Sequence, residues 1–359
     1  MKISRRGFIG TGLAAPLILH AQDKAGTKAP VVGSGEWTFE WIGDWGELPS
    51  DIKWGNTHNV AEDSQGNIYI HHTVYADSEI PDSMVVFDHK GKFIRSWGKE
   101  YKGVAHGMWL HKEGKEEFLY LTVNAANARI HLDPGELPAT IVKTTLKGEI
   151  VWKVEGPPDI DAYRVPTGTP PAMPPYNPTN IAIAPNGDLF VADGYGSYYI
   201  NHYNHKGEYI NTYGGRGTDP GKFKEPHGIW VDNRTSNPIL VVADRRNNRL
   251  QRLTLDGQFI DFVTGFRLPC HFHEQKGNVV IPDLQTRVTL IDKNNEIILH
   301  LGDPDPGGPA NPPRNTADRA SFVPGQFVCP HGACFDHEGN IFVVEWVEMG
   351  RVTKLRKTV

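Results

Sequence analysis

Hydrophobic and polar positions alternate in short runs along most of this chain, and no long stretch after the N-terminus shows helical periodicity. In residues 180–193 two apolar runs flank the turn sequence Asn-Gly at positions 186 and 187. Residues 227–260 contain four such runs, bounded by Gly, Asn and Asp. Runs of β-branched and aromatic residues between these turn formers predict β-strands joined by tight turns. We therefore expect an all-β protein.

The strands fall into repeating units, and each unit opens with a short segment that carries a proline or a histidine. The six opening segments are residues 56–58, 104–106, 178–180, 226–227, 270–271 and 330–331. Four strands per unit, at a period of roughly 40–50 residues, is typical of a propeller blade. The prediction is a six-bladed β-propeller over residues 37–359, with the Pro-rich segments 156–178 and 303–324 as loops inserted between blades.

The last unit ends near residues 352–355 and lacks a fourth strand, whereas residues 37–42 form a strand with no unit of their own. This N-terminal strand is expected to complete the last blade and to close the ring. Closure removes the exposed sheet edges that an open array would leave. Residues 23–36 are then expected to be a linker.

The first 22 residues are expected to lie outside the fold. Arg5 and Arg6 precede a short apolar run at residues 10–19, which predicts a twin-arginine signal peptide over residues 1–22. The alternative is an ordinary signal peptide or anchor that contains two arginines. Because the run is too short to span a bilayer comfortably, no stable membrane span is expected after cleavage. The prediction is a periplasmic or secreted protein that passes through the twin-arginine export machinery.

The charge balance narrows the range of partners. The chain has 37 Lys and Arg against 42 Asp and Glu, a net charge of −5. Removing residues 1–22 takes away Lys2, Arg5 and Arg6, which changes the net charge to −8. No basic run remains, so nucleic acid is not expected as a partner. The expected partner is a small-molecule or peptide substrate.

Five of the six opening segments carry a histidine at the equivalent place, namely His58, His106, His227, His271 and His331. Of these, His106, His227 and His331 fall on alternate blades, which are related by about 120° in a six-bladed ring. Three converging imidazoles leave one face of an ion open, as a catalytic zinc-type site requires. The alternative is that each His-Gly sequence is only a structural turn.

The remaining histidines and the cysteines at the opening segments have less definite roles. His58 and His271 lie on blades one and five, where each could support the ligands, contact a substrate or belong to a different ligand set. Cys270 and Cys329 flank ring histidines on adjacent blades. They could form one disulfide, lie near the metal, or simply be small buried residues. Three cysteines do not make a disulfide framework.

Several sequence motifs resemble those of a known enzyme family. They are residues 178–180, 191–196, 220–223, 226–228, 243–249 and 330–332. On these motifs the chain resembles bacterial NHL-repeat propellers related to peptidyl-α-hydroxyglycine α-amidating lyase (peptidylamidoglycolate lyase). The likeness spans most of the chain after residue 50 and is tightest over residues 177–261.

The resemblance implies a site and a reaction. The family holds zinc with histidines of alternate blades, which match His106, His227 and His331, and zinc or another transition metal is the implied cofactor. Its catalytic tyrosine matches Tyr195, and an active-site arginine matches Arg245. The family cleaves a carbinolamide carbon–nitrogen bond and releases an amide and glyoxylate. A metal lowers the pKa of a hydroxyl, an ionised tyrosine can take its proton, and a guanidinium can hold a carboxylate.

Two positions depart from the family. Its second active-site arginine lies on a strand of blade one, where this chain reads Ile-His-His-Thr at residues 70–73. Its aspartate after the last zinc histidine, which helps to bind a structural calcium, is replaced here by Gly332. Neither calcium binding nor recognition of a glycine-derived carboxylate is therefore carried over, and the substrate stays open.

Other functions are compatible with the pattern. One is a non-catalytic NHL propeller that binds a protein or a glycan, and another is a lactonase-like propeller hydrolase. Lactonase-like propellers resemble calcium enzymes with Glu, Asn and Asp ligands, whereas imidazoles suit zinc, copper or iron better. Under a purely structural interpretation, Tyr195 would pack a loop and Arg245 would form an ion pair between blades. The hypothesis that best fits the motifs is an exported, metal-dependent carbon–nitrogen lyase.

Overall fold

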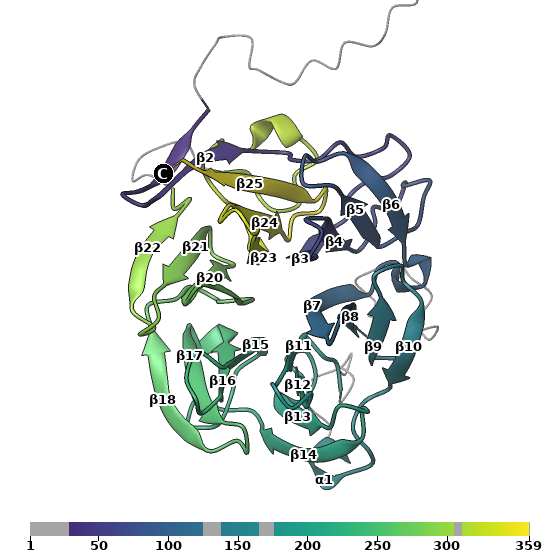
Figure 1. The fold of residues 1–359 in the computed structure, drawn as a ribbon, viewed down its shortest axis with the longest axis vertical. Coiled ribbons are helices and arrows are strands. Elements are labelled where there is room, and N and C mark those ends of the chain that lie inside the picture. Colours follow the sequence, from purple (N-terminus) through teal and green to yellow (C-terminus); the bar gives the residue numbers. More distant parts are fainter. Residues whose placement is uncertain (1–28, 125–137, 165–175, 305–310, 359) are drawn as a thin grey trace, which may run out of the picture.

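The computed structural model describes residues 29–124, 138–164, 176–304 and 311–358, and in these residues six antiparallel sheets stand around a central axis (Figure 1). The all-β, six-bladed propeller predicted from the strand pattern is confirmed. The helices in this described part of the chain are short: they are the α-helix α1 (Asp161–Arg164) and the 3-10 helices η1 (Lys99–Tyr101), η2 (Arg245–Asn247) and η3 (Arg319–Ser321).

Each blade runs outward from an inner strand that lies next to the axis (Figure 1). Blade one consists of β3 (Thr57–Glu62), β4 (Ile68–His72), β5 (Met84–Phe87) and β6 (Phe93–Trp97). Blade two consists of β7 (Ala105–Glu113), β8 (Glu116–Val123), β9 (Thr140–Thr145) and β10 (Ile150–Val154). Blade three consists of β11 (Asn180–Ile183), β12 (Leu189–Ala192), β13 (Tyr199–Tyr203) and β14 (Tyr209–Gly214).

The other three blades follow the same order along the chain. Blade four consists of β15 (Pro226–Asp232), β16 (Ile239–Asp244), β17 (Arg249–Thr254) and β18 (Phe259–Thr264). Blade five consists of β19 (His273–Gln275), β20 (Asn278–Asp283), β21 (Arg287–Ile291) and β22 (Ile297–Leu301). Blade six consists of β23 (Pro330–Phe335), β24 (Ile341–Glu345), β25 (Arg351–Lys357), β2 (Trp37–Ile42) and β1 (Val31–Ser34).

The ring closes as the sequence predicted, through an N-terminal strand. β2 pairs antiparallel with β25, with Trp41 opposite Leu355, and so becomes the fourth strand of blade six. One detail differs from the expected linker over residues 23–36, because Val31–Ser34 forms β1 and pairs with the outer side of β2. The predicted signal peptide, residues 1–22, lies outside the described residues. Within the described residues, no helix combines the length and hydropathy needed to cross a bilayer.

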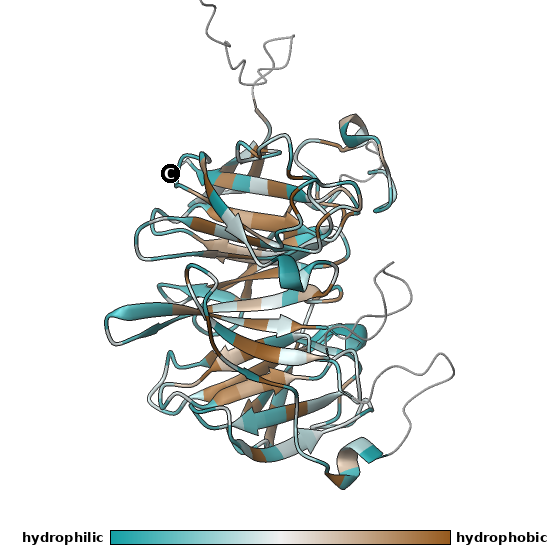
Figure 2. Cartoon of the chain, turned by 90° about the vertical axis from the view of Figure 1, so that its right-hand side faces the viewer, coloured by the Kyte–Doolittle hydropathy of each residue, from teal (hydrophilic) through white to brown (hydrophobic). Residues whose placement is uncertain are grey.

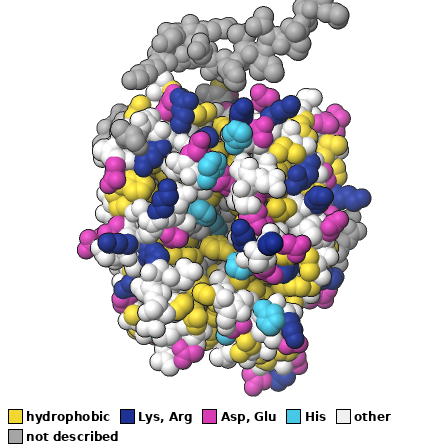
Figure 3. Space-filling view, in the orientation of Figure 1, with side chains coloured by type: hydrophobic (Ala, Val, Ile, Leu, Met, Phe, Trp, Pro, Cys, Tyr) yellow, Lys and Arg dark blue, Asp and Glu magenta, His cyan; other side chains and the backbone are white. Residues whose placement is uncertain are grey.

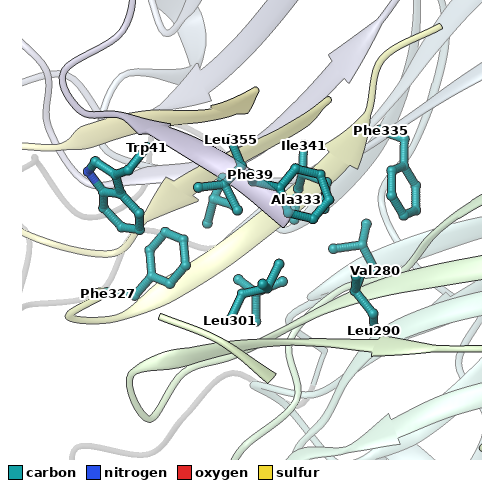
Figure 4. Packing of buried hydrophobic residues seen from close by; sticks show 12 residues of the cluster. Phe39, Trp41, Val280, Leu290, Leu301, Phe327, Ala333, Phe335, Ile341 and Leu355 are labelled. Carbon is teal, nitrogen blue, oxygen red and sulfur yellow. The ribbon is translucent and has the colours of Figure 1, made fainter. Parts of the chain in front are cut away.

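Hydrophobic side chains fill the space between neighbouring blades. Figure 4 shows this at the closure, where Phe327 lies toward Leu301 of blade five and Phe335 of blade six lies toward Val280 of blade five. The Trp41 and Phe327 ring centroids are 4.6 Å apart. Burying each such side chain contributes about 1.5–3 kcal/mol. Figure 2 shows the same pattern across the molecule, since apolar positions follow the strands whereas the loops are mostly hydrophilic.

Candidate metal centre

Four of the ring histidines lie together near the axis, at the start of inner strands. They are His58 (β3), His106 (β7), His227 (β15) and His331 (β23), and none is more than 5% exposed. The ring centroids of His106, His227 and His331 are 4.7–5.1 Å apart. The structure thus brings the three predicted ligands together from blades two, four and six. Figure 3 shows that one face of the molecule is hollowed at its centre, with histidine side chains along the hollow.

A β-bulge directs each of these histidines out of its blade. In blade six, Pro330 faces Glu345 and Gly332 faces Val344, so His331 has no residue opposite it on β24. The same shift in register occurs at the histidine in blades one, two and four. A bulge bends the strand and redirects a side chain. Here it turns the imidazole from the sheet toward the axis.

The glycine after each predicted ligand lets adjacent inner strands approach closely. A Cβ on Gly107 would lie 2.4 Å from the backbone oxygen of Thr179 in the next blade. The corresponding distances are 2.7 Å from Gly228 to the Cys270 oxygen and 2.6 Å from Gly332 to the His58 oxygen. These contacts account for the His-Gly sequence. They also explain why the aspartate of the family cannot stand at Gly332 without a shift of the backbone.

We expect Gly107→Ala to lower the free energy of unfolding by about 1–3 kcal/mol, because its Cβ would overlap backbone of the neighbouring blade. Urea denaturation followed by circular dichroism measures the change. Gly43→Ala is the matched control, since the nearest atom to its Cβ is Trp41 Nε1 at 3.2 Å. Equal stability of the two variants would contradict this account of the close approach.

The close approach fixes the protonation pattern of the three imidazoles. His106 Nδ1 donates to the Thr179 carbonyl at 2.7 Å, His227 Nδ1 to the Cys270 carbonyl at 2.8 Å and His331 Nδ1 to the His58 carbonyl at 2.8 Å. Each carbonyl belongs to the opening segment of the next blade. Because a carbonyl can only accept, the proton of each neutral ring is on Nδ1. Nε2 therefore keeps its lone pair, as a metal ligand requires.

Burial keeps these imidazoles neutral. Desolvation lowers the pKa of His106 to about 3, and it also lowers the pKa of His227 and of His331 well below the usual range. The nearby Arg245 guanidinium and the other imidazoles depress each pKa further. A neutral imidazole is the form that binds a metal. The site therefore offers unprotonated nitrogens throughout the physiological pH range.

The two predicted catalytic residues reach the same place. The Tyr195 hydroxyl lies 3.2 Å from His106 Nε2 and 3.2 Å from His227 Nε2, and Arg245 Nη2 lies 3.2 Å from that hydroxyl. Tyr195 follows β12 in blade three, and Arg245 begins η2 after β16 in blade four. Desolvation raises the pKa of Tyr195, whereas the Arg245 guanidinium opposes this rise. The phenol, the guanidinium and two imidazoles form one connected cluster.

The sequence did not reveal the immediate partners of Arg245. Arg245 forms a buried ion pair with Glu225, and the same carboxylate also pairs with Arg246. Arg245 Nη1 lies 3.7 Å from Cys270 Sγ. In the sequence, the only indication of this ion pair was a glutamate two residues before His227 together with two successive arginines. Because both terminal nitrogens of Arg245 already have contacts, its guanidinium is not free to bind a substrate carboxylate through two parallel hydrogen bonds.

The remaining candidate ligands differ in whether their ligand atoms lie close enough together to share a metal ion. Two groups of ligand atoms lie within 4.8 Å of one another among the described residues: His58, His106 and His331 form one, and His227, Cys270 and His331 form the other. The predicted trio is therefore divided between two groups that share His331. His271 belongs to neither group, and its imidazole lies 6.4 Å from the Trp109 ring. Cys270, Cys329 and Cys334 are all free thiols, so the possible Cys270–Cys329 disulfide is not formed.

The blade-one histidines that stand where the family has an arginine are buried. His72 Nδ1 accepts from the backbone N–H groups of Val74 at 3.1 Å and Gly55 at 3.3 Å. In blade six, Glu345 has the same place at the end of the second strand and accepts from Val328 N–H at 2.6 Å. His72 thus has a structural role in holding the loop before β3.

Comparison with known proteins agrees with the fold and with a distant family resemblance. No family model matches the chain. The chain is 25% identical over 257 residues to peptidyl-glycine alpha-amidating monooxygenase of Mus musculus, a match that covers 62% of this chain and 24% of the mouse protein. It is 36% identical over 104 residues to peptidyl-alpha-hydroxyglycine alpha-amidating lyase 1 of Drosophila melanogaster, covering 25% of this chain and 19% of the fly protein. The chain thus spans about a quarter or less of these relatives.

Solved structures show the same architecture. Virginiamycin B lyase from Staphylococcus aureus superposes with a TM-score of 0.52 at 15% identity, covering 89% of this chain and 99% of that one. A gluconolactonase from Xanthomonas campestris gives a TM-score of 0.51 at 12% identity, covering 89% of each chain. The molecule is a six-bladed propeller with NHL-like repeats that resembles the peptidylglycine alpha-amidating enzymes, as the sequence motifs predicted.

Proposed function

We propose that this protein is an exported, metal-dependent lyase similar to peptidylamidoglycolate lyase, which cleaves a carbinolamide-type carbon–nitrogen bond. The observation that carries the proposal is the position of the Tyr195 hydroxyl, within 3.2 Å of two imidazole Nε2 atoms and of the Arg245 guanidinium. A phenol at this place is next to both the candidate metal ligands and a fixed positive charge. Such a group is suited to proton transfer at a substrate hydroxyl.

The donor set fits a transition metal. His106, His227 and His331 would hold the ion through Nε2, since each Nδ1 is bound to a backbone carbonyl. Imidazole nitrogens favour zinc, copper or iron, whereas calcium takes oxygen ligands. A bound divalent ion would supply the positive charge that lowers the pKa of a substrate hydroxyl. The same donor set argues against a calcium-dependent, lactonase-like hydrolase.

The residues around the site would carry out the proton transfer. Once ionised, Tyr195 would take the proton of the carbinol hydroxyl, the carbon–nitrogen bond would break and the carbon–oxygen bond would become a carbonyl. The leaving amide nitrogen receives one proton, so the products are an amide and an aldehyde with no other reactant consumed. Arg245 stabilises the phenolate through its contact at 3.2 Å, and Glu225 holds the guanidinium in place.

The experiment is an assay for glyoxylate released from a peptidyl-α-hydroxyglycine by metal-loaded protein purified without a histidine tag. Turnover that depends on the metal supports the proposal. No turnover on this substrate, together with stoichiometric metal binding, would refute this substrate class, and related carbinol or hydroxy-acid substrates would be tested next. A non-catalytic propeller that binds a protein or a glycan would show neither turnover nor a need for metal.

Export through the twin-arginine pathway is part of the proposal and rests on Arg5 and Arg6 ahead of the short apolar run. Changing both residues to lysine is expected to abolish export, because that pathway recognises the arginine pair itself. Immunoblots of periplasmic and cytoplasmic fractions measure the distribution of the protein. A variant with Lys2→Arg keeps the pair and should be exported normally. Normal periplasmic levels of the double-lysine variant would exclude this pathway.

A further inference from the structure

We infer that His58 is a fourth imidazole ligand of the metal, so that the centre is built from four histidines rather than three. The inference deepens the proposed function and rests on its metal site. Its basis is the position of His58, which places a ligand atom within 4.8 Å of those of His106 and His331. Its ring centroid lies 4.7 Å from that of His106 and 4.8 Å from that of His331.

The structural setting of His58 matches that of the three predicted ligands. It stands at the start of an inner strand, the register of that strand shifts at His58, and the side chain is only 5% exposed. Its backbone carbonyl accepts from His331 Nδ1, so the residue is also part of the frame that orients another ligand. His58 thus belongs to the wall of the site in both its backbone and its side chain.

His58 differs from the other three histidines in the hydrogen bonding of its Nδ1 atom. Their Nδ1 atoms are bound to carbonyls, whereas His58 Nδ1 is buried without a hydrogen-bond partner among the described residues. An unsatisfied buried polar atom costs about 1–3 kcal/mol. A metal ion at the axis, coordinated by the His58 imidazole, would remove that cost. The second cluster offers a poorer fourth donor, because Cys270 Sγ is 3.4 Å from the Leu268 carbonyl and 3.7 Å from the Arg245 cation.

A fourth imidazole changes which metals can catalyse. Structural zinc sites have four protein ligands in a tetrahedron, whereas catalytic zinc sites keep one position open. Four histidines would fill all four coordination positions of a tetrahedral ion. Only an ion that takes five or six ligands would keep a coordination position for the substrate. The proposed centre should therefore accept cobalt(II) or iron(II) with open positions.

The test measures metal binding directly. Metal-free mature protein is titrated with Co²⁺, the visible spectrum is recorded, and the affinity is measured by competition with a chelator. His58→Ala is expected to bind Co²⁺ at least about 10–100-fold more weakly, since even outer residues of metal sites contribute that much. The spectrum should shift because one nitrogen donor is lost. His58→Phe keeps the volume of the ring without a donor and should behave in the same way.

Two further variants make the outcome decisive. His271→Ala is the matched control, because His271 has the equivalent place in blade five, is 4% exposed and lies outside both donor groups. His227→Ala shows the effect of losing one of the three ligands predicted from the sequence. If His227→Ala loses binding while both His58 variants keep the wild-type affinity and spectrum, the four-histidine inference is wrong and the lyase proposal stands. If the wild-type protein binds no Co²⁺, both fail.

Discussion

Tyr195→Phe is expected to lower kcat for the lyase reaction by about 10²–10⁴-fold, the usual contribution of a positioned acid–base group. The substitution removes only the hydroxyl that lies 3.2 Å from His106 Nε2, from His227 Nε2 and from Arg245 Nη2. The imidazoles keep their backbone carbonyl partners, so the metal content and the fold should be unchanged. Glyoxylate release under saturating substrate measures kcat, and elemental analysis of the same sample measures the metal.

Tyr198→Phe provides the control, because Tyr198 lies in the same loop but stacks against Arg216, whose guanidinium carbon is 4.3 Å from the ring centroid. This variant should retain wild-type kcat. Equal activity of wild type and Tyr195→Phe would remove the proton-transfer role from Tyr195. A Tyr195→Phe protein that has also lost its metal would instead make the tyrosine a ligand or a support of the metal site.

His227→Ala is expected to abolish stoichiometric metal binding and, with it, all turnover. His227 is fully buried, lies within 4.7–5.0 Å of two other ring imidazoles, and presents Nε2 next to the Tyr195 hydroxyl. Loss of one of so few ligands removes much of the binding free energy of such a site. Metal content is measured by elemental mass spectrometry after dialysis against a chelator, on protein purified without a histidine tag.

The exposed His205 gives a matched control, since His205→Ala removes an imidazole from a turn outside the ring. This variant should retain a full equivalent of metal. If His227→Ala also retains one, the metal site is elsewhere in the chain. Circular dichroism on both variants separates loss of metal from loss of fold, because the carbonyl of Cys270 also loses its hydrogen-bond donor in His227→Ala.

Much of the architecture follows from local sequence pattern. Runs of alternating hydrophobic and polar residues, with turn residues at regular intervals, predict four-stranded units. The alternation within a single strand already indicates which of its faces is buried. The spare strand at Trp37–Ile42 and the short last unit together indicated the closure that β2 and β25 make. The position of β1 did not follow, because a strand added at the outer edge is stabilised by pairing with β2 and carries little hydrophobic signal of its own.

The repeat places equivalent positions on one ring, so the sequence predicted that His106, His227 and His331 converge, and the family resemblance added Tyr195 and Arg245. These five residues do meet. Only the tertiary structure decided how they are held. It alone shows that each ligand Nδ1 is fixed by a carbonyl of the next blade and that Glu225 holds Arg245. It also separates His58 from His271, which the repeat pattern treats alike. The reason is physical: such contacts cross between blades, and their distances depend on the bulges and backbone approach of two separate sheets.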